Sequence, residues 1–215
     1  MSEDVNRIDL RDARKADTED RVIAAASDLF VAQGYAATAL TQIATLAGVA
    51  PRTVYVRFGT KAALLSRAID VALVGDTAPV SVADRAWYQQ SLTLPTASER
   101  HVVFARGARL LFERAGRLLI VAAQAETTEP TIATAAQEAR RATRQNHRTF
   151  WHAMQRDGLL PDGVDFEWLV DTSALLGSAD TYVQITRLYD WNLDTYEAWL
   201  CTTWTRLSAL ASASG

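Results

Sequence analysis

The sequence predicts an all-α fold, with a small three-helix head at the N-terminus and a larger helical body behind it. Two observations support this expectation. Apolar residues recur at helical spacing over most of the chain, with Gly or Pro at the ends of the periodic segments, and no segment shows strand-like alternation. Residues 1–16 are polar, mixed in charge and without periodicity, which predicts a flexible arm. We place the head at 17–60 and the body at 61–215, beginning with a linking helix at 61–74.

Composition is that of a folded protein and excludes several kinds of site. Of the 215 residues, 49% are hydrophobic and 22% are charged, which is ordinary for a globular chain. The single cysteine, Cys201, excludes an intrachain disulfide and a paired-cysteine zinc site. Residues 2–20 contain no apolar run, and no later stretch of about 18 apolar residues could span a membrane. We therefore expect a cytoplasmic protein with no membrane partner.

Capping residues and breaks define the three helices of the head. Asp17 or Thr18 can cap a first helix, which stops at Gly34. A second helix ends at Gly48, and a third begins at Pro51, a residue suited to a first helical turn. The three short helices follow one another with only a few residues between them, as in a compact helical unit.

The second and third helices have the layout of a helix-turn-helix. Ala44 is small where two helices cross closely, Gly48 can take the left-handed conformation that ends the second helix, and Val54 packs back onto the crossing. The third helix can then insert its N-terminus into a major groove. Its outward residues are expected to be Pro51, Arg52, Thr53, Tyr55 and Arg57.

Charge is distributed along the chain in a way that suits contact with a polyanion. The formal net charge is -3, yet no Asp or Glu occurs between Asp28 and Asp70. Arg52, Arg57 and Lys61 fall within that gap. Because an acidic side chain near phosphate would repel it, this pattern predicts double-stranded DNA as the partner of the head.

The N-terminal residues resemble the TetR family of transcriptional regulators. The resemblance rests on residues at fixed spacing: Leu29, Phe30, Gly34, Tyr35, Thr38, Ile43, Ala44, Ala47, Gly48, Val49, Val54, Tyr55, Phe58, Lys61 and Leu64. It implies an all-helical homodimer with one operator-reading head per subunit. It also implies a cavity for a small-molecule effector in each body, whose chemistry the sequence does not name.

The resemblance also implies roles for individual residues of the head. Tyr55 and Lys61 would contact DNA phosphates, while Arg52 and Thr53 would read bases. The chemistry agrees, because the planar fork of Arg52 can bind guanine O6 and N7 together and Lys61 is a point charge suited to phosphate. Arg57, on the same face, could serve either role.

Hydroxyl side chains near the second helix are further candidates for phosphate contact. Thr38 or Thr41 could donate a hydrogen bond to a phosphate oxygen. Family members often have a second hydroxyl residue after the first threonine, and here Ala39 occupies that position. Thr41 could make that phosphate contact in its place.

The body is predicted to be helical almost throughout. Residues 75–97 form a connector that includes a short helix at 82–92. Longer helices are expected at 98–126, 130–157, 165–190 and 194–211.

The last two of these helices carry wide apolar stripes rich in aromatic residues, which is typical of an interface and also of an internal core. We favour a homodimer interface, because helix-turn-helix heads normally work on paired half-sites. The residues assigned to this interface are Trp168, Leu175, Leu176, Ala179, Tyr196, Trp199, Thr203, Trp204 and Leu207.

Aromatic and polar residues on inward faces of the body are the candidates for an effector pocket. A cluster of this kind would suit a flat, largely apolar molecule, although each residue could equally be plain core. The candidates are Trp87, Tyr88, Phe112, Asn146, Phe150, Trp151, Met154, Thr172 and Tyr182.

No motif points to catalysis, a metal or a cofactor. His101, His147 and His152 lack the i, i+4 spacing of a helical metal site, and there is no HExxH, GxSxG or phosphate-loop motif. We therefore expect a sequence-specific regulator, a repressor that a small molecule releases from a palindromic operator. Activation, a protein-interaction module of the same fold and a helical enzyme are the alternatives.

Overall fold

The computed structural model describes residues 2–74 and 81–210, and within these ranges it contains helices and no strand. The all-α prediction is therefore confirmed. No described helix combines the length and the apolar character needed to cross a bilayer. In chain order the elements are α1 (Ser2–Ala37), α2 (Leu40–Leu46), α3 (Pro51–Phe58), α4 (Lys61–Val74), the 3-10 turn η1 (Val82–Asp84), α5 (Ala86–Ser91), α6 (Ala97–Ala125), α7 (Pro130–Arg156), α8 (Phe166–Leu176), α9 (Ala179–Tyr189) and α10 (Leu193–Leu210).

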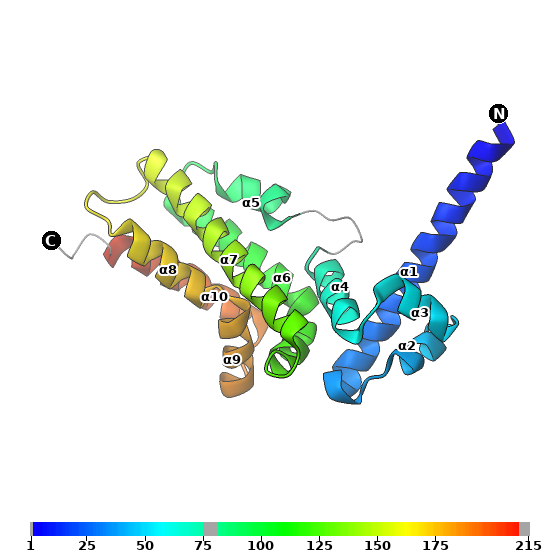
Figure 1. Cartoon of the computed structure of the whole chain (residues 1–215). Helices are drawn as coiled ribbons and strands as arrows, with labels where there is room; N and C mark the ends of the chain where they lie inside the picture. The colour runs from blue at the N-terminus through cyan, green and yellow to red at the C-terminus, as the bar shows by residue number, and fades with distance from the viewer. Residues whose placement is uncertain (1, 75–80, 211–215) are drawn as a thin grey trace.

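The head consists of α1 to α3, and α4 joins it to the body (Figure 1). Val22, Phe30, Ile43 and Val54 are fully buried between these helices. The same core continues into the body, because α6 and α7 contribute Leu118, Val121, Ala125 and Ile132 to it. The core of the head therefore extends into the body.

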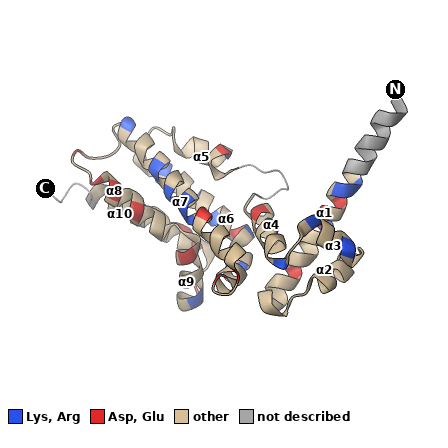
Figure 2. Cartoon of the chain, viewed as in Figure 1, with Lys and Arg blue, Asp and Glu red and all other residues tan. Residues whose placement is uncertain are grey.

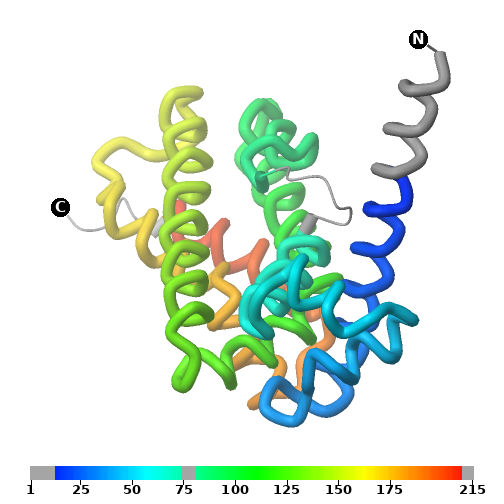
Figure 3. Tube along the Cα trace, turned by 45° about the vertical axis from the view of Figure 1, so that its right-hand side comes forward, coloured from blue at the N-terminus to red at the C-terminus, as the bar shows by residue number. Residues whose placement is uncertain are grey.

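The body is built around the long helix α6, which contacts α4, α5, α9 and α10 (Figure 3). Its core is rich in aromatic rings. The rings of Phe104 and Phe150 stack with their centroids 4.3 Å apart, and Phe112 stacks on Tyr182 at 4.6 Å. These rings come from α6, α7 and α9, so stacking holds three helices together.

A buried polar group ties α8 to α7 within this core. The hydroxyl of Ser173 accepts a hydrogen bond from Trp151 Nε1 at 2.7 Å and lies 3.0 Å from His147 Nδ1. Burial lowers the pKa of His147 to about 3, which favours the neutral ring. Polar side chains this deep in a core need such partners, because an unpaired polar group in apolar surroundings is costly.

Two sequence predictions differ from the structure. Residues 2–16, predicted to be a flexible arm, are helical and belong to α1, a segment without Gly or Pro to interrupt a helix. The single helix predicted at 165–190 is divided into α8 and α9. The division follows from Ser178, whose side chain accepts a hydrogen bond from the Thr181 N–H and so caps a new helix.

Candidate nucleic-acid interface and body cavity

The turn between α2 and α3 has the geometry that a helix-turn-helix requires. Gly48 has φ +66°, and a Cβ added there would meet nothing within 4 Å, so backbone conformation alone calls for glycine. The Val49 N–H donates to the Ala44 carbonyl at 3.0 Å, which closes the end of α2. Val54 is fully buried and fixes the rotation of α3 about its own axis.

With Val54 turned inward, α3 exposes a polar face to solvent. Pro51 and Arg52 are exposed at its start, and Tyr55 has 50% of its surface exposed one turn later. Thr53 and Arg57 are half-buried beside them, while Thr41 is exposed on α2. Of the residues predicted to contact DNA, Thr41, Pro51, Arg52 and Tyr55 are therefore exposed to solvent, and Thr53 and Arg57 are partly exposed.

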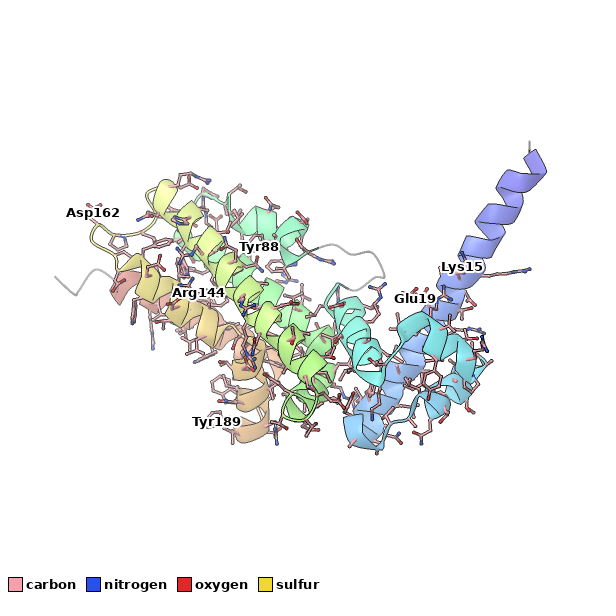
Figure 4. The ribbon with its side chains drawn as sticks, in the orientation of Figure 1. Lys15, Glu19, Tyr88, Arg144, Asp162 and Tyr189 are labelled. Atoms are coloured by element: carbon pink, nitrogen blue, oxygen red, sulfur yellow. The ribbon has the colours of Figure 1, made fainter. Side chains whose placement is uncertain are left out.

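A basic residue that the sequence analysis missed, Lys15, joins this face. It lines a shallow concavity together with Arg52 and Arg57, and in Figure 4 it projects from α1 at the edge of the head. Figure 2 shows basic residues on α1 and α3 at this outer edge. Treating 1–16 as an irregular arm hid Lys15, because only a continuous α1 places it beside α3.

Glu19 on α1 limits how freely Arg57 can act. Its carboxylate forms a 3.0 Å ion pair with Arg67 on α4 and lies 3.9 Å from Arg57 Nε. Arg57 is therefore drawn toward α1, whereas Arg52 is fully on the outside of the same helix. Of the two arginines of α3, Arg52 is the better placed to reach a base edge.

Two residues predicted to contact phosphate, Thr38 and Lys61, make hydrogen bonds within the head. Thr38 is 2% exposed, and its hydroxyl donates to the Gly34 carbonyl at 2.7 Å. Lys61 donates from Nζ to the Tyr35 carbonyl at 2.8 Å and lies 4.2 Å from the centre of the Tyr35 ring. Both side chains satisfy carbonyls that the end of α1 leaves without helical partners.

Ala39, the departure from the family pattern, is the N-terminal cap of α2 and has no side-chain hydrogen bond to offer. Gln42 compensates, because its Oε1 accepts the Ala39 N–H at 2.8 Å. Gln33 on α1 donates to the same oxygen at 3.2 Å. The start of α2 is thus anchored to α1 without the expected hydroxyl.

The residues predicted to form an effector pocket do not line the cavity that the body contains beside α4. Six of the nine predicted residues are buried in the aromatic core, and none of the nine lines this cavity. Trp87, Asn146 and Thr172 are half-buried, and the buried six are Tyr88, Phe112, Phe150, Trp151, Met154 and Tyr182. Aromatic rings at inward positions stack on one another and leave little space between them.

The cavity lies instead between α4 and the α6, α7 and α9 helices, with a volume of about 160 Å³. Its apolar lining includes Leu65, Ile69, Leu73, Leu119, Ile132 and Val183. Alanines at positions 122, 123, 135, 136 and 139 also line it, and their small side chains leave the space against α4 unfilled. This run of alanines was the sequence signal for a cavity, in contrast to the aromatic stripes.

The residues assigned to a dimer interface divide into two groups. Tyr196 and Trp204 are fully buried within the single chain, which removes them from any surface that a second copy could contact. Trp168 and Leu175 on α8 are 44% and 66% exposed. The remaining candidates are half-buried: Leu176, Ala179, Trp199, Thr203 and Leu207.

Comparison with known proteins shows that the head is similar to a family of bacterial regulators. Residues 22–68 match the model of the bacterial regulatory proteins of the tetR family. No curated protein matches the chain by sequence.

Solved structures share the fold over nearly the whole chain. A protein from Mesorhizobium loti assigned to the TetR-family transcriptional regulators is 18% identical with a TM-score of 0.69, covering 92% of this chain and 98% of its own. PfmR from Thermus thermophilus, a TetR family transcriptional regulator, is 18% identical with a TM-score of 0.61, covering 88% and 97%. NalD, the secondary repressor of the MexAB-OprM multidrug efflux pump in Pseudomonas aeruginosa, is 21% identical with a TM-score of 0.59, covering 88% and 95%.

The match at the head and the likeness of fold agree with each other. The matched residues run from α1 through the helix-turn-helix into α4. The solved structures extend the similarity through the helical body, where identity is low and only the fold is shared. Residues 22–68 thus match the tetR family of bacterial regulatory proteins, and the chain as a whole shares its fold with solved structures assigned to TetR-family regulators.

Proposed function

We propose that this regulator is a transcriptional repressor, not an enzyme, and that it acts in the cytoplasm as a homodimer on a palindromic operator. The observation that carries the proposal is the outward face of α3, where Arg52 and Tyr55 stand exposed on a helix oriented by the buried Val54. No acidic residue occurs between Asp28 and Asp70 to repel phosphate, and Glu19, which lies 3.9 Å from Arg57, is paired with Arg67.

The exposed side chains suggest a division of roles on DNA. Arg52 is the proposed base reader, through a bidentate contact with guanine worth about 1–3 kcal/mol of discrimination. Thr53, next to it, is a second reader. Tyr55, Thr41 and Lys15 are proposed to position the head by contacting phosphates, which carries affinity without sequence information.

Selection of bound sequences from a random DNA pool tests this proposal. We expect a palindromic site whose half-sites are about 34–36 Å apart, or a multiple of that spacing. Arg52→Ala should relax the preference at one position of each half-site, whereas Arg141→Ala, an exposed arginine on α7 of the body, should leave the site unchanged. A protein that selects no sequence at modest ionic strength would contradict the proposal.

The proposed dimer uses the exposed part of α8 and the outer side of α10. Leu175→Glu would place a charge in the interface, and we expect it to shift the protein to monomers in sedimentation measurements. Leu188→Glu, at an equally exposed leucine of α9 outside this surface, is the matched control. Dissociation by the control and not by Leu175→Glu would move the interface to α9.

The proposed effector enters the cavity beside α4 and releases the operator. Because α4 follows α3 directly, a change in how α4 packs on the body would change the position of the head. A ligand can act in this way only if it binds the two arrangements with different affinity. A reporter gene behind the selected operator shows the sign of regulation: its expression should rise when the regulator is deleted, and a fall would indicate an activator.

A further inference from the structure

The cavity beside α4 is apolar inside and carries its charges on the solvent side. Three acidic residues and one basic residue line it: Asp70 of α4, Glu126 after α6, Asp180 of α9 and Arg140 of α7. Their formal charges leave an excess of two negative charges around a small apolar space. The question is which of these charges already have partners.

Arg140 is fully committed to two carboxylates. Its Nη1 and Nη2 donate to the two oxygens of Glu126 at 2.8 and 2.9 Å, and its Nε and Nη2 donate to the two oxygens of Asp180, each at 2.8 Å. An anionic ligand would have to displace one of these bidentate pairs. The side of the cavity that contains Arg140 therefore offers nothing to an anion.

Asp70 is the acid at the cavity whose charge is least compensated. The structure records no hydrogen bond or ion pair of its carboxylate among the described residues, and its charge is opposed only by Arg67, which is already paired with Glu19 at 3.0 Å. Partial burial raises the pKa of Asp70. Asp70 is exposed at the rim of the cavity, so a cation can reach its carboxylate from solvent, and beside the apolar lining the pair is stronger than in free solution.

The approach to the cavity has the same sign. A wider open groove adjoins it and shares Ser66 and Asp70 of α4 with its lining. Glu138 on α7 adds a further carboxylate to this groove, and Arg67 of α4, which pairs with Glu19, adds one positive charge, so the formal charges of the lining leave one negative charge in excess. A cation is therefore favoured along the groove as well as within the cavity.

Resting on the proposed function, we infer that the effector is a small organic monocation with an apolar body, whose ammonium pairs with Asp70. Size supports this class, since the cavity measures about 160 Å³ and an apolar cavity of about 150 Å³ accommodates one benzene molecule. An arylalkylammonium ion places one such ring among the alanines and leucines and its charge at α4.

Binding at this place would act directly on the linking helix. The ring would lie between α4 and α7, while the ammonium would hold Asp70 on α4. Leu65 and Ala68, on the same helix, belong to the core shared by head and body. A shift of α4 against α6 would therefore reach the head through that core.

Titration calorimetry on the full-length protein without DNA tests the inference. The probes are the phenethylammonium ion, the neutral 2-phenylethanol and the anionic phenylacetate, which share one ring. We expect phenethylammonium to bind at least tenfold more tightly than either of the others. Asp70→Asn should remove that preference while leaving the weak binding of the alcohol, and Glu138→Gln, at the groove but not at the cavity, should keep it.

A second variant locates the site. Ala136→Leu fills the cavity without changing charge and should abolish binding of all three probes. Equal affinities for the three probes, tighter binding of phenylacetate, or no heat with any of them would overturn the inference. DNA binding is scored separately, because phenethylammonium should lower operator affinity by about 5–150-fold. A protein that binds the cation but no DNA would refute the proposed function and retain the site.

Discussion

The head and the body are held together by cores of different chemistry. In the head, small and aliphatic side chains dominate, and Phe30 and Tyr35 are its buried rings among the described residues. In the body, rings from several helices stack on one another around Phe104. The body should therefore behave as a stiff unit, while the head, whose core runs on into α6, can respond to small shifts of α4.

The largest expected effect lies in the aromatic body. Trp151→Ala removes a fully buried ring and the hydrogen bond from Nε1 to Ser173, and it should lower the free energy of unfolding by about 3–5 kcal/mol. Urea denaturation followed by circular dichroism measures it. If Trp151→Ala lowered the free energy of unfolding by less than Val54→Ala does in the head, the aromatic core of the body would not contribute more to stability than the core of the head.

The close packing of Gly107 on α6 against the ring of Trp87 leads to a second prediction for the body. Gly107 lies within a helix, where alanine usually stabilises by about 0.5–1 kcal/mol. Here a Cβ would lie 2.1 Å from Trp87 Cε3, so Gly107→Ala should destabilise by about 1–3 kcal/mol, measured in urea. Gln124→Ala, an exposed position on the same helix, is the control, and a stabilised Gly107→Ala would mean that Trp87 packs loosely.

Acid should weaken the body rather than the head, because all the histidines lie in the body. Burial lowers the pKa of His147 to about 3 and that of His101 to about 4, from an ordinary value of 6.5. Below pH 6.5 these two histidines are protonated in the unfolded chain but stay neutral in the folded chain. The free energy of unfolding therefore decreases as the pH is lowered from 6.5 toward the lowered pKa values. Each histidine contributes a slope of about 1.4 kcal/mol per pH unit.

Unfolding free energies at pH 7 and pH 5 test this dependence. His147→Asn should reduce the difference between the two values by the share of one histidine. His152→Asn, at an exposed position on the same helix, should leave it as in the unmodified protein. If hydrogen exchange at pH 5 increased first in α2 and α3, the assignment of acid sensitivity to the body would be wrong.

The smallest expected effect separates two residues of the head. Lys61→Met removes the hydrogen bond to the Tyr35 carbonyl and should lower the free energy of unfolding by about 1 kcal/mol without DNA present. Arg52→Ala, at an exposed position, should change stability by less than about 0.5 kcal/mol while changing DNA preference. If Lys61→Met were as stable as Arg52→Ala, the hydrogen bond from Lys61 would contribute nothing to the fold, and Lys61 would be available to contact a DNA phosphate.

Sequence patterns were sufficient where one residue has one physical task. The left-handed Gly48 and the inward Val54 each follow from a local requirement, so the turn and the outward side of α3 could be anticipated. The partner of Lys61 could not, because the Tyr35 carbonyl lies 26 residues earlier in the chain, and the bond from Thr38 to the Gly34 carbonyl depends on how the backbone turns at the end of α1. A sequence pattern does not show whether a polar side chain binds a group within the fold or a ligand.

In the body the pattern identified apolar faces without identifying what they touch. Helical spacing marks Tyr196 and Trp204 as members of a stripe, but only the packing of α10 on α6 and α8 shows that they face the chain's own core. A cavity is defined by side chains that are too short to meet. For that reason it was located by alanines, which periodicity counts simply as apolar.

The core that continues from α1 and α4 into α6 has a consequence for engineering. Leu118, Val121 and Ala125 of α6 and Ile132 of α7 pack against apolar residues of the first four helices. A chimera that joins these four helices to the body of another protein would lose this packing. The body residues that contact the four helices would have to be transferred with them. We therefore expect that operator specificity is changed more easily by substituting the exposed residues of α3 than by exchanging the whole head.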